Sequence, residues 1–283
     1  MLAALTGCGL RTEDDAPRLP FLPGREPLPG ETLLLTLLDS CGRSAYRGAP
    51  KDVDATGILA TQRTVLRDAL LRAGVPTDVV DAPVEAGHDA PPADTQAGAE
   101  LVVRCLEVAR DDFLPLLGAL SAQRIAATTW AGSDQTWPTP SRAAWATEQA
   151  TVAGDAWQAT QSAVWTLQYV AAHVTGATRT KVTSTLRALW TLQQDMLAAA
   201  GEHAPAPQLG QKPPATSPSA AKAAELADTA LRRLREQLAD GFADLAADRA
   251  RAFQLATWLA TAELQAHRWA TPLTAFPGLK TPA

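Results

Sequence analysis

Apolar residues in the first half of the chain recur at intervals of three and four positions, which is the spacing of one helical face. This pattern predicts helices over residues 31–47 and 54–73, and a third helical stretch over residues 94–130. Pro115 interrupts the third stretch, and because proline lacks the N–H that a helix interior needs, we expect a kink or a division near residues 111–112. Residues 75–92 are rich in proline and are expected to form a loop.

The second half shows the helical spacing more clearly and predicts helices over residues 141–174, 177–200, 219–240 and 244–269. The expected inner stripe of residues 177–200 is Val182, Leu186, Leu189, Met196 and either Leu192 or Gln193. A long proline-rich segment, residues 201–218, separates two pairs of closely joined helices. This order is that of a four-helix bundle with one long crossover, the ferritin-like arrangement.

Residues 132–140 contain glycine, aspartate and prolines, a composition typical of a linker, and we expect a domain boundary there. The predicted organisation is a signal remnant with a lipidation motif over residues 1–8, a proline-rich tether over 9–30, a helical region over 31–132, and the ferritin-like bundle over 141–275. Whether the helical region has its own core or packs on the bundle is left open by the sequence.

Composition supports an all-α fold, because the chain is rich in alanine and has only 5 phenylalanines and 2 tyrosines. The formal net charge of −5 and the pI near 5.4 do not favour nucleic acid as a partner. No uninterrupted apolar stretch reaches the roughly 18 residues that a membrane span needs.

The first residues nevertheless indicate a membrane anchor. Leu5, Thr6 and Gly7 precede Cys8 in the order leucine, small residue, glycine, cysteine that marks bacterial lipidation. Two acyl chains on Cys8 would hold the protein on a membrane, whereas one chain binds only marginally. The alternative is a chance cysteine near the start of the chain, since residues 1–7 contain no Lys or Arg and are short for a signal sequence.

Cys41 and Cys105 form an even pair once Cys8 is assigned to lipid. In an oxidising compartment such a pair predicts a disulfide, which would close a long loop and stabilise the fold. The alternative is two buried, reduced thiols that pack as small apolar groups.

Three segments together resemble a known family: the opening residues 6–17, the bundle half from Arg142, and the closing Glu263-Leu-Gln-Ala-His-Arg-Trp269 with Phe276-Pro-Gly-Leu279. They resemble actinobacterial lipoproteins that contain a ferritin-like domain of unknown function. The resemblance covers the anchor and about residues 141–280. It implies a lipid anchor, a helical bundle and an extracytoplasmic location, and it implies no particular reaction.

A ferritin-like bundle raises the question of metal. Di-iron bundles use Glu-x-x-His motifs, and the predicted bundle over residues 141–275 has none; Glu85 and His88 have this spacing but lie in the predicted loop over residues 75–92. Glu263 and His267 are spaced four apart and share a helical face. If the first helix of the bundle starts level with the end of the last, Glu148 joins them as a candidate metal site for iron or another divalent ion. The alternative is that Glu263 and His267 form a surface pair and that Glu148 stabilises its helix N-terminus.

The sequence lacks the usual catalytic motifs, including Gly-x-Ser-x-Gly, His-Glu-x-x-His, Cys-x-x-Cys and phosphate loops. We therefore expect a non-enzymatic, membrane-anchored extracytoplasmic lipoprotein that needs no cofactor and binds or scaffolds another component of the cell envelope. The alternative is a ferritin-like metal-binding or oxidase protein with a degenerate carboxylate and histidine site.

Overall fold

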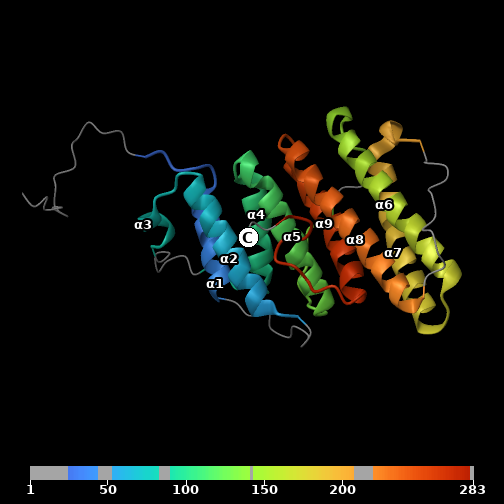
Figure 1. Ribbon diagram of the computed structural model, residues 1–283. Coiled ribbons are helices and arrows are strands. Elements are labelled where there is room, and N and C mark those ends of the chain that lie inside the picture. Colours follow the sequence, from blue (N-terminus) through green and yellow to red (C-terminus); the bar gives the residue numbers. More distant parts are fainter. Residues whose placement is uncertain (1–24, 44–52, 83–89, 141–142, 207–218, 281–283) are drawn as a thin grey trace, which may run out of the picture.

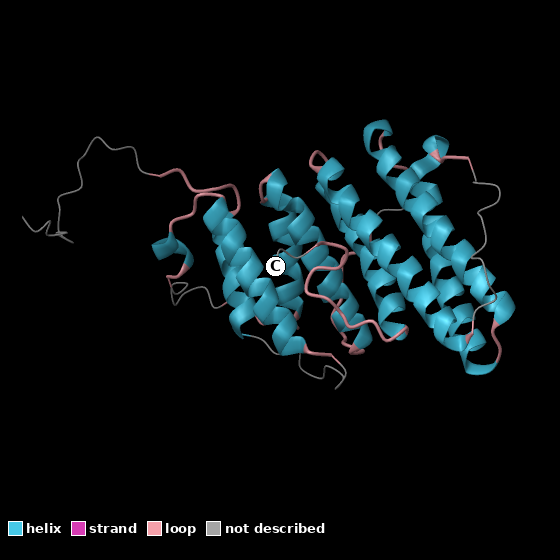
Figure 2. Ribbon diagram, viewed as in Figure 1, coloured by secondary structure: helices cyan, strands magenta, loops and turns pink. Residues whose placement is uncertain are grey.

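The computed structural model describes residues 25–43, 53–82, 90–140, 143–206 and 219–280. These residues form an all-α protein, and none of them lies in a β-strand (Figures 1 and 2). The predicted fold class is therefore confirmed at the level of an all-helical chain. In Figure 1 the helices lie side by side in one array, with α1, α2 and the short α3 at one end and α6 and α7 at the other.

The helices of the first half follow the predicted spacing closely. They are α1 (Glu31–Arg43), α2 (Ala55–Arg72), the short α3 (Thr77–Val80) and α4 (Gln96–Val108), of which α3 falls in a segment expected to be a loop. Two of them begin with side-chain caps, because Asp54 accepts from the N–H of Gly57 at 2.9 Å and Thr95 accepts from that of Gly98 at 3.1 Å.

The predicted division near residues 111–112 is confirmed. A 3₁₀ turn, Asp111–Phe113, separates α4 from α5 (Leu114–Trp130). Pro115 lies in the first turn of α5, where its missing N–H costs nothing, so this proline begins a helix and does not kink one.

The second half contains α6 (Thr147–His173), α7 (Gly176–Ala200), α8 (Ala220–Asp240) and α9 (Arg249–Arg268). The predicted stripe of α7 is buried, and Leu192 takes the position for which Gln193 was the alternative. The first helix of this half starts at residue 147 and not at 141, and Ser141 itself lies outside the described residues. Ser219 caps α8 by accepting from the N–H of Lys222 at 3.3 Å.

Contacts at the helix ends fix the directions of α6–α9. The N–H of Trp145 donates to the carbonyl of Ala199 at 2.8 Å, which places the start of α6 at the end of α7. Gly241, after α8, packs so closely on α6 that a β-carbon there would lie 2.9 Å from Val152. The ends of α7 and α8 therefore lie at the same end of the bundle, and α8 begins at the opposite end.

Helix α5 belongs to the same packed body as α6–α9. Its most extensive helix partner is α9, and it also contacts α4 and α8. One continuous apolar core runs through both halves, from Leu34 and Leu106 through Leu120 to Leu167 and Leu259. Residues 132–140 are thus a connection on the outside of a shared core. The sequence left open whether residues 31–132 have their own core, and the structure shows that they pack on the bundle.

Candidate functional site

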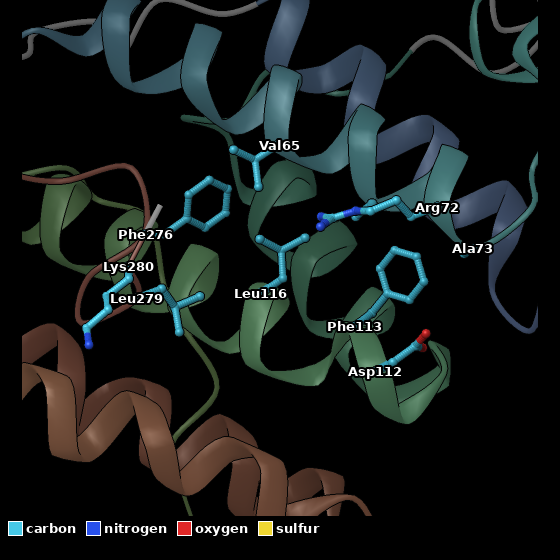
Figure 3. Close-up of a pocket in the computed structure, with 10 residues that line it drawn as sticks. Val65, Arg72, Ala73, Asp112, Phe113, Leu116, Phe276, Leu279 and Lys280 are labelled. Carbon is cyan, nitrogen blue, oxygen red and sulfur yellow. The ribbon is translucent and has the colours of Figure 1, made fainter. Parts of the chain in front are cut away.

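One hollow in the described part of the chain is a largely apolar groove bounded by three segments (Figure 3). Helix α2 forms one wall, the start of α5 with its preceding turn forms the second, and the segment after α9 forms the third. Its volume is about 320 Å³. The lining residues are Val65, Ala69, Arg72, Ala73, Asp112, Phe113, Leu116, Phe276, Leu279 and Lys280.

The floor of the groove is apolar and its rim is cationic. Phe113 and Phe276 are each only 3% exposed, so both rings are fixed in the core below the opening. Figure 3 shows Arg72 at one end and Lys280 at the other, and neither has a carboxylate partner among the described residues. Asp112, also at the rim, is paired with Arg110. The groove therefore suits an apolar group that carries negative charge.

The segment after α9 is held in place by partly buried polar contacts. The carbonyl of Ala275 accepts from Gln62 Nε2 of α2 at 3.1 Å, and Thr271 Oγ1 donates to Asp228 of α8 at 2.6 Å. Gly278 has a φ of +76°, and a β-carbon there would lie 2.2 Å from the carbonyl oxygen of Arg235. Only glycine fits this position, and it directs Leu279 and Lys280 to the groove.

Cys41 and Cys105 are free, buried thiols, so the structure does not contain the predicted disulfide and has instead the alternative of two packed thiols. The two sulfurs have different partners. Cys105 Sγ donates to the carbonyl of Leu33 at 3.4 Å, whereas Cys41, two turns further along α1, donates to Gln62 at 3.9 Å. Burial raises the pKa of the Cys105 thiol to about 12 and also raises the pKa of Cys41.

A buried arginine lies beside Cys41. Arg124 of α5 is fully buried, and its Nη2 donates to Cys41 Sγ at 3.3 Å. Its Nε and Nη1 have no hydrogen-bond partner among the described residues. The positive charge of Arg124 lowers the pKa of Cys41, but burial outweighs it, so the thiol stays protonated. The sequence gives no signal for the burial of Arg124, because an arginine in an amphipathic pattern is normally exposed.

Glu263 and His267 do share one face of α9, as predicted, but both are already engaged. Glu263 is fully buried, and one of its oxygens accepts from Arg235 of α8 at 2.5 Å. The other accepts from the N–H of Thr274 at 2.7 Å. The Nδ1 of His267 lies 3.0 Å from the carbonyl of Thr271, and its ring contacts Trp130 edge-on at 4.6 Å. These two side chains join α9 to the segment that follows it.

Glu148 lies at the opposite end of the bundle and is exposed in the first turn of α6. Trp145, just before this helix, donates to Gln254 near the start of α9 at 2.9 Å. Glu263 comes nine residues later on α9, about 14 Å further along the axis. The expected shared layer assumed that α6 starts level with the end of α9, and the crossover reverses this. No group of three or more His, Cys, Asp or Glu residues suited to a metal occurs in the described residues.

Comparisons with protein-family models, with curated proteins and with solved structures found no match for this chain. Cys8, the predicted lipidation site, lies outside the described residues. Among the helices that the structure describes, none is both long and apolar enough to span a membrane. The family resemblance and the lipid anchor therefore stay predictions from the sequence.

Proposed function

We propose that the protein is a non-enzymatic binding module of the cell envelope, anchored outside the cytoplasmic membrane by a lipid on Cys8, and that its bundle has the ferritin-like arrangement. The observation that carries the binding role is the groove between α2, α5 and the segment after α9, with buried aromatic rings below a cationic rim. Its volume lies at the low end of the roughly 300–1,000 Å³ typical of ligand sites, so it suits a few apolar side chains.

The occupant that fits is a protein segment with apolar side chains next to acidic ones. Arg72 and Lys280 are exposed at opposite ends of the opening, so a bound segment can place a carboxylate near either end (Figure 3). Apolar side chains of the partner that pack on Phe276 and Leu116 would be removed from contact with water. This burial of apolar surface supplies most of the free energy of binding. An extracytoplasmic anchor would place this groove among the proteins of the envelope, so the partner we propose is an envelope protein.

The groove can be tested with 1-anilinonaphthalene-8-sulfonate, an apolar dye with one negative charge. We expect saturable binding to the folded protein that is lost in Ala69→Trp, because the indole fills the space between α2 and α5. Ala60→Trp is the matched control, since Ala60 is exposed on the same helix and lines none of the groove. Equal dye binding by both variants would show that the groove is not the site.

A photoreactive amino acid at position 69 identifies the partner in cells. We expect one crosslinked envelope protein that is not crosslinked from position 60. Crosslinks of equal yield from both positions would contradict a specific partner at the groove.

The anchor is tested separately by growing the native cells with an alkyne-tagged fatty acid. We expect the tag on the wild-type protein and its loss in Cys8→Ser, together with release of the protein from the membrane fraction. An untagged wild-type protein would contradict the anchor without bearing on the groove.

A further inference from the structure

Charged side chains are unevenly distributed along the bundle of α6–α9. At one end, the start of α7 lies beside the end of α9, because Trp269 Nε1 donates to Thr185 Oγ1 at 3.1 Å. The first half of α8 lies there too, since Asp228 accepts from Thr271. In Figure 1 this end lies at the lower right, where α6 turns into α7. Its exposed cations, which together we call the basic end, are Arg179, Lys181, Arg187 and Arg268.

The basic end is one continuous surface whose positive charge is not neutralised. Arg268 Nη1 of α9 donates to Ser184 of α7 at 3.3 Å, so the two helices present their cations side by side. None of the four cations forms an ion pair with a carboxylate in the described part of the chain. The carboxylates of α8 toward this end are already engaged, since Glu225 accepts from Lys222 at 2.8 Å and Asp228 accepts from Thr271.

The opposite end of the bundle is acidic. The carboxylates there come from the first third of α6, from the last turns of α7 and α8 and from the turns that follow them: Glu148, Asp155, Asp195, Glu202, Asp240, Asp244 and Asp248. Helix α6 has 27 residues and is about 40 Å long, several times the screening length of about 8 Å at physiological salt. An anionic surface therefore attracts the basic end and repels the acidic end, which favours one orientation of the bundle.

Aromatic side chains of α6 lie next to the basic end. His173 is in the last turn of α6, and its ring centre lies 4.4 Å from that of Tyr169, one turn earlier. The ring of Trp165, a further turn back, stacks on Tyr169 at 6.3 Å. Tryptophan and tyrosine are enriched where a protein meets the headgroups of a bilayer, because an apolar ring with a polar tip suits that boundary. Cations beside such rings are typical of surfaces that bind anionic lipid.

We propose that the basic end docks on the anionic phospholipid surface of a membrane, with α6–α9 pointing away from it. Arg179 and Arg187 are about 12 Å apart along α7, so an extended anionic surface contacts more of the cations than one small anion would. The groove is a separate surface. Arg249 at the start of α9 donates to the carbonyl of Ala109, which places the turn with Asp112 level with the acidic end. Docking therefore leaves the Asp112 end of the groove facing away from the membrane.

The test uses the full chain with Cys8→Ser, which cannot carry a lipid on Cys8, and vesicles of equal parts phosphatidylglycerol and phosphatidylcholine. Each cation at such a surface strengthens binding about fivefold, so Arg179→Gln with Arg187→Gln should weaken binding about 30-fold. Arg63→Gln with Arg104→Gln is the matched control, because both arginines are exposed on α2 and α4, and it should leave binding nearly unchanged. Arg179→Lys with Arg187→Lys keeps the charge and should bind as the parent chain does.

A polarity-sensitive fluorophore reports the orientation, and it labels an added surface cysteine selectively because Cys41 and Cys105 are buried. On Thr183→Cys of α7 its emission should shift to shorter wavelength when vesicles are added, whereas on Thr147→Cys at the start of α6 it should not. Failure of the parent chain to bind, equal weakening by the arginine and control pairs, or a shift at position 147 alone would overturn the docking. Each of these results leaves the dye test of the groove, and so the proposed function, unaffected.

Discussion

At the scale of single residues, burial decides the chemistry of Cys105. Its pKa rises to about 12 from an ordinary value of 9.0 because the thiolate would be desolvated. Between these values the unfolded chain releases the proton while the folded chain keeps it, so stability falls as the pH rises. The loss approaches about 1.4 kcal/mol per pH unit for one proton. Urea unfolding at several pH values above 9 should show a shallower decline for Cys105→Ala than for wild type. Equal slopes would contradict the raised pKa.

Arg124 gives a second prediction at this scale, because a buried charge with one sulfur partner costs more solvation than it regains. Replacing such a charge with an apolar side chain of similar length is often neutral or stabilising by about 1–4 kcal/mol. We therefore expect Arg124→Met to unfold at equal or higher urea concentration than wild type. Arg124→Ala, which leaves a cavity, should be less stable than Arg124→Met. A strongly destabilised Arg124→Met would show that the guanidinium is fully compensated.

At the scale of elements, Gly278 determines the third wall of the groove. A β-carbon at this position meets the carbonyl of Arg235 at 2.2 Å, and its φ of +76° is unfavourable for other residues. Gly278→Ala should therefore displace Phe276 and Leu279 and weaken dye binding at least several-fold. Gly132→Ala is the control, because Gly132 also has a positive φ but has no atom near its β-carbon position. If both variants weaken dye binding equally, the segment that contains Gly278 does not form part of the dye site.

Helix positions were largely predictable from the sequence, because apolar spacing reports directly on which face is buried. The stripe from Val182 to Met196 on α7 is an example. Helix direction was treated less consistently, because the order of elements predicted one long crossover whereas the candidate metal site assumed four helices that alternate in direction. That one choice separates Glu148 from Glu263. The hydrogen bonds from Arg235 and Thr274 to Glu263 could not be predicted from the spacing of residues along α9 either, because both partners come from other segments.

At the scale of the whole molecule, the predicted boundary at residues 132–140 relied on local composition, which does not report on long-range packing. Prolines and a glycine do form a connection there, as expected. The helices on its two sides nevertheless pack together, since α5 lies against α9 and Arg249 of α9 donates to the carbonyl of Ala109 at 3.1 Å. The groove shows the same limit. Phe276 and Gly278 stood out in the sequence as a motif, but only the fold brings them to α2.

The shared core predicts that the two halves unfold together. Leu120 of α5 is fully buried in it, and most tryptophans lie in the second half. Leu120→Ala should destabilise the protein by about 2–5 kcal/mol. Tryptophan fluorescence and far-ultraviolet circular dichroism should shift by the same amount, because loss of α5 exposes α9. Leu192→Ala, in α7, should likewise shift both signals together. The opposite result would be a fluorescence transition whose midpoint is unchanged by Leu120→Ala, together with two separate transitions in the dichroism signal. This result would mean that α6–α9 keep their fold without α5, as two independent domains would.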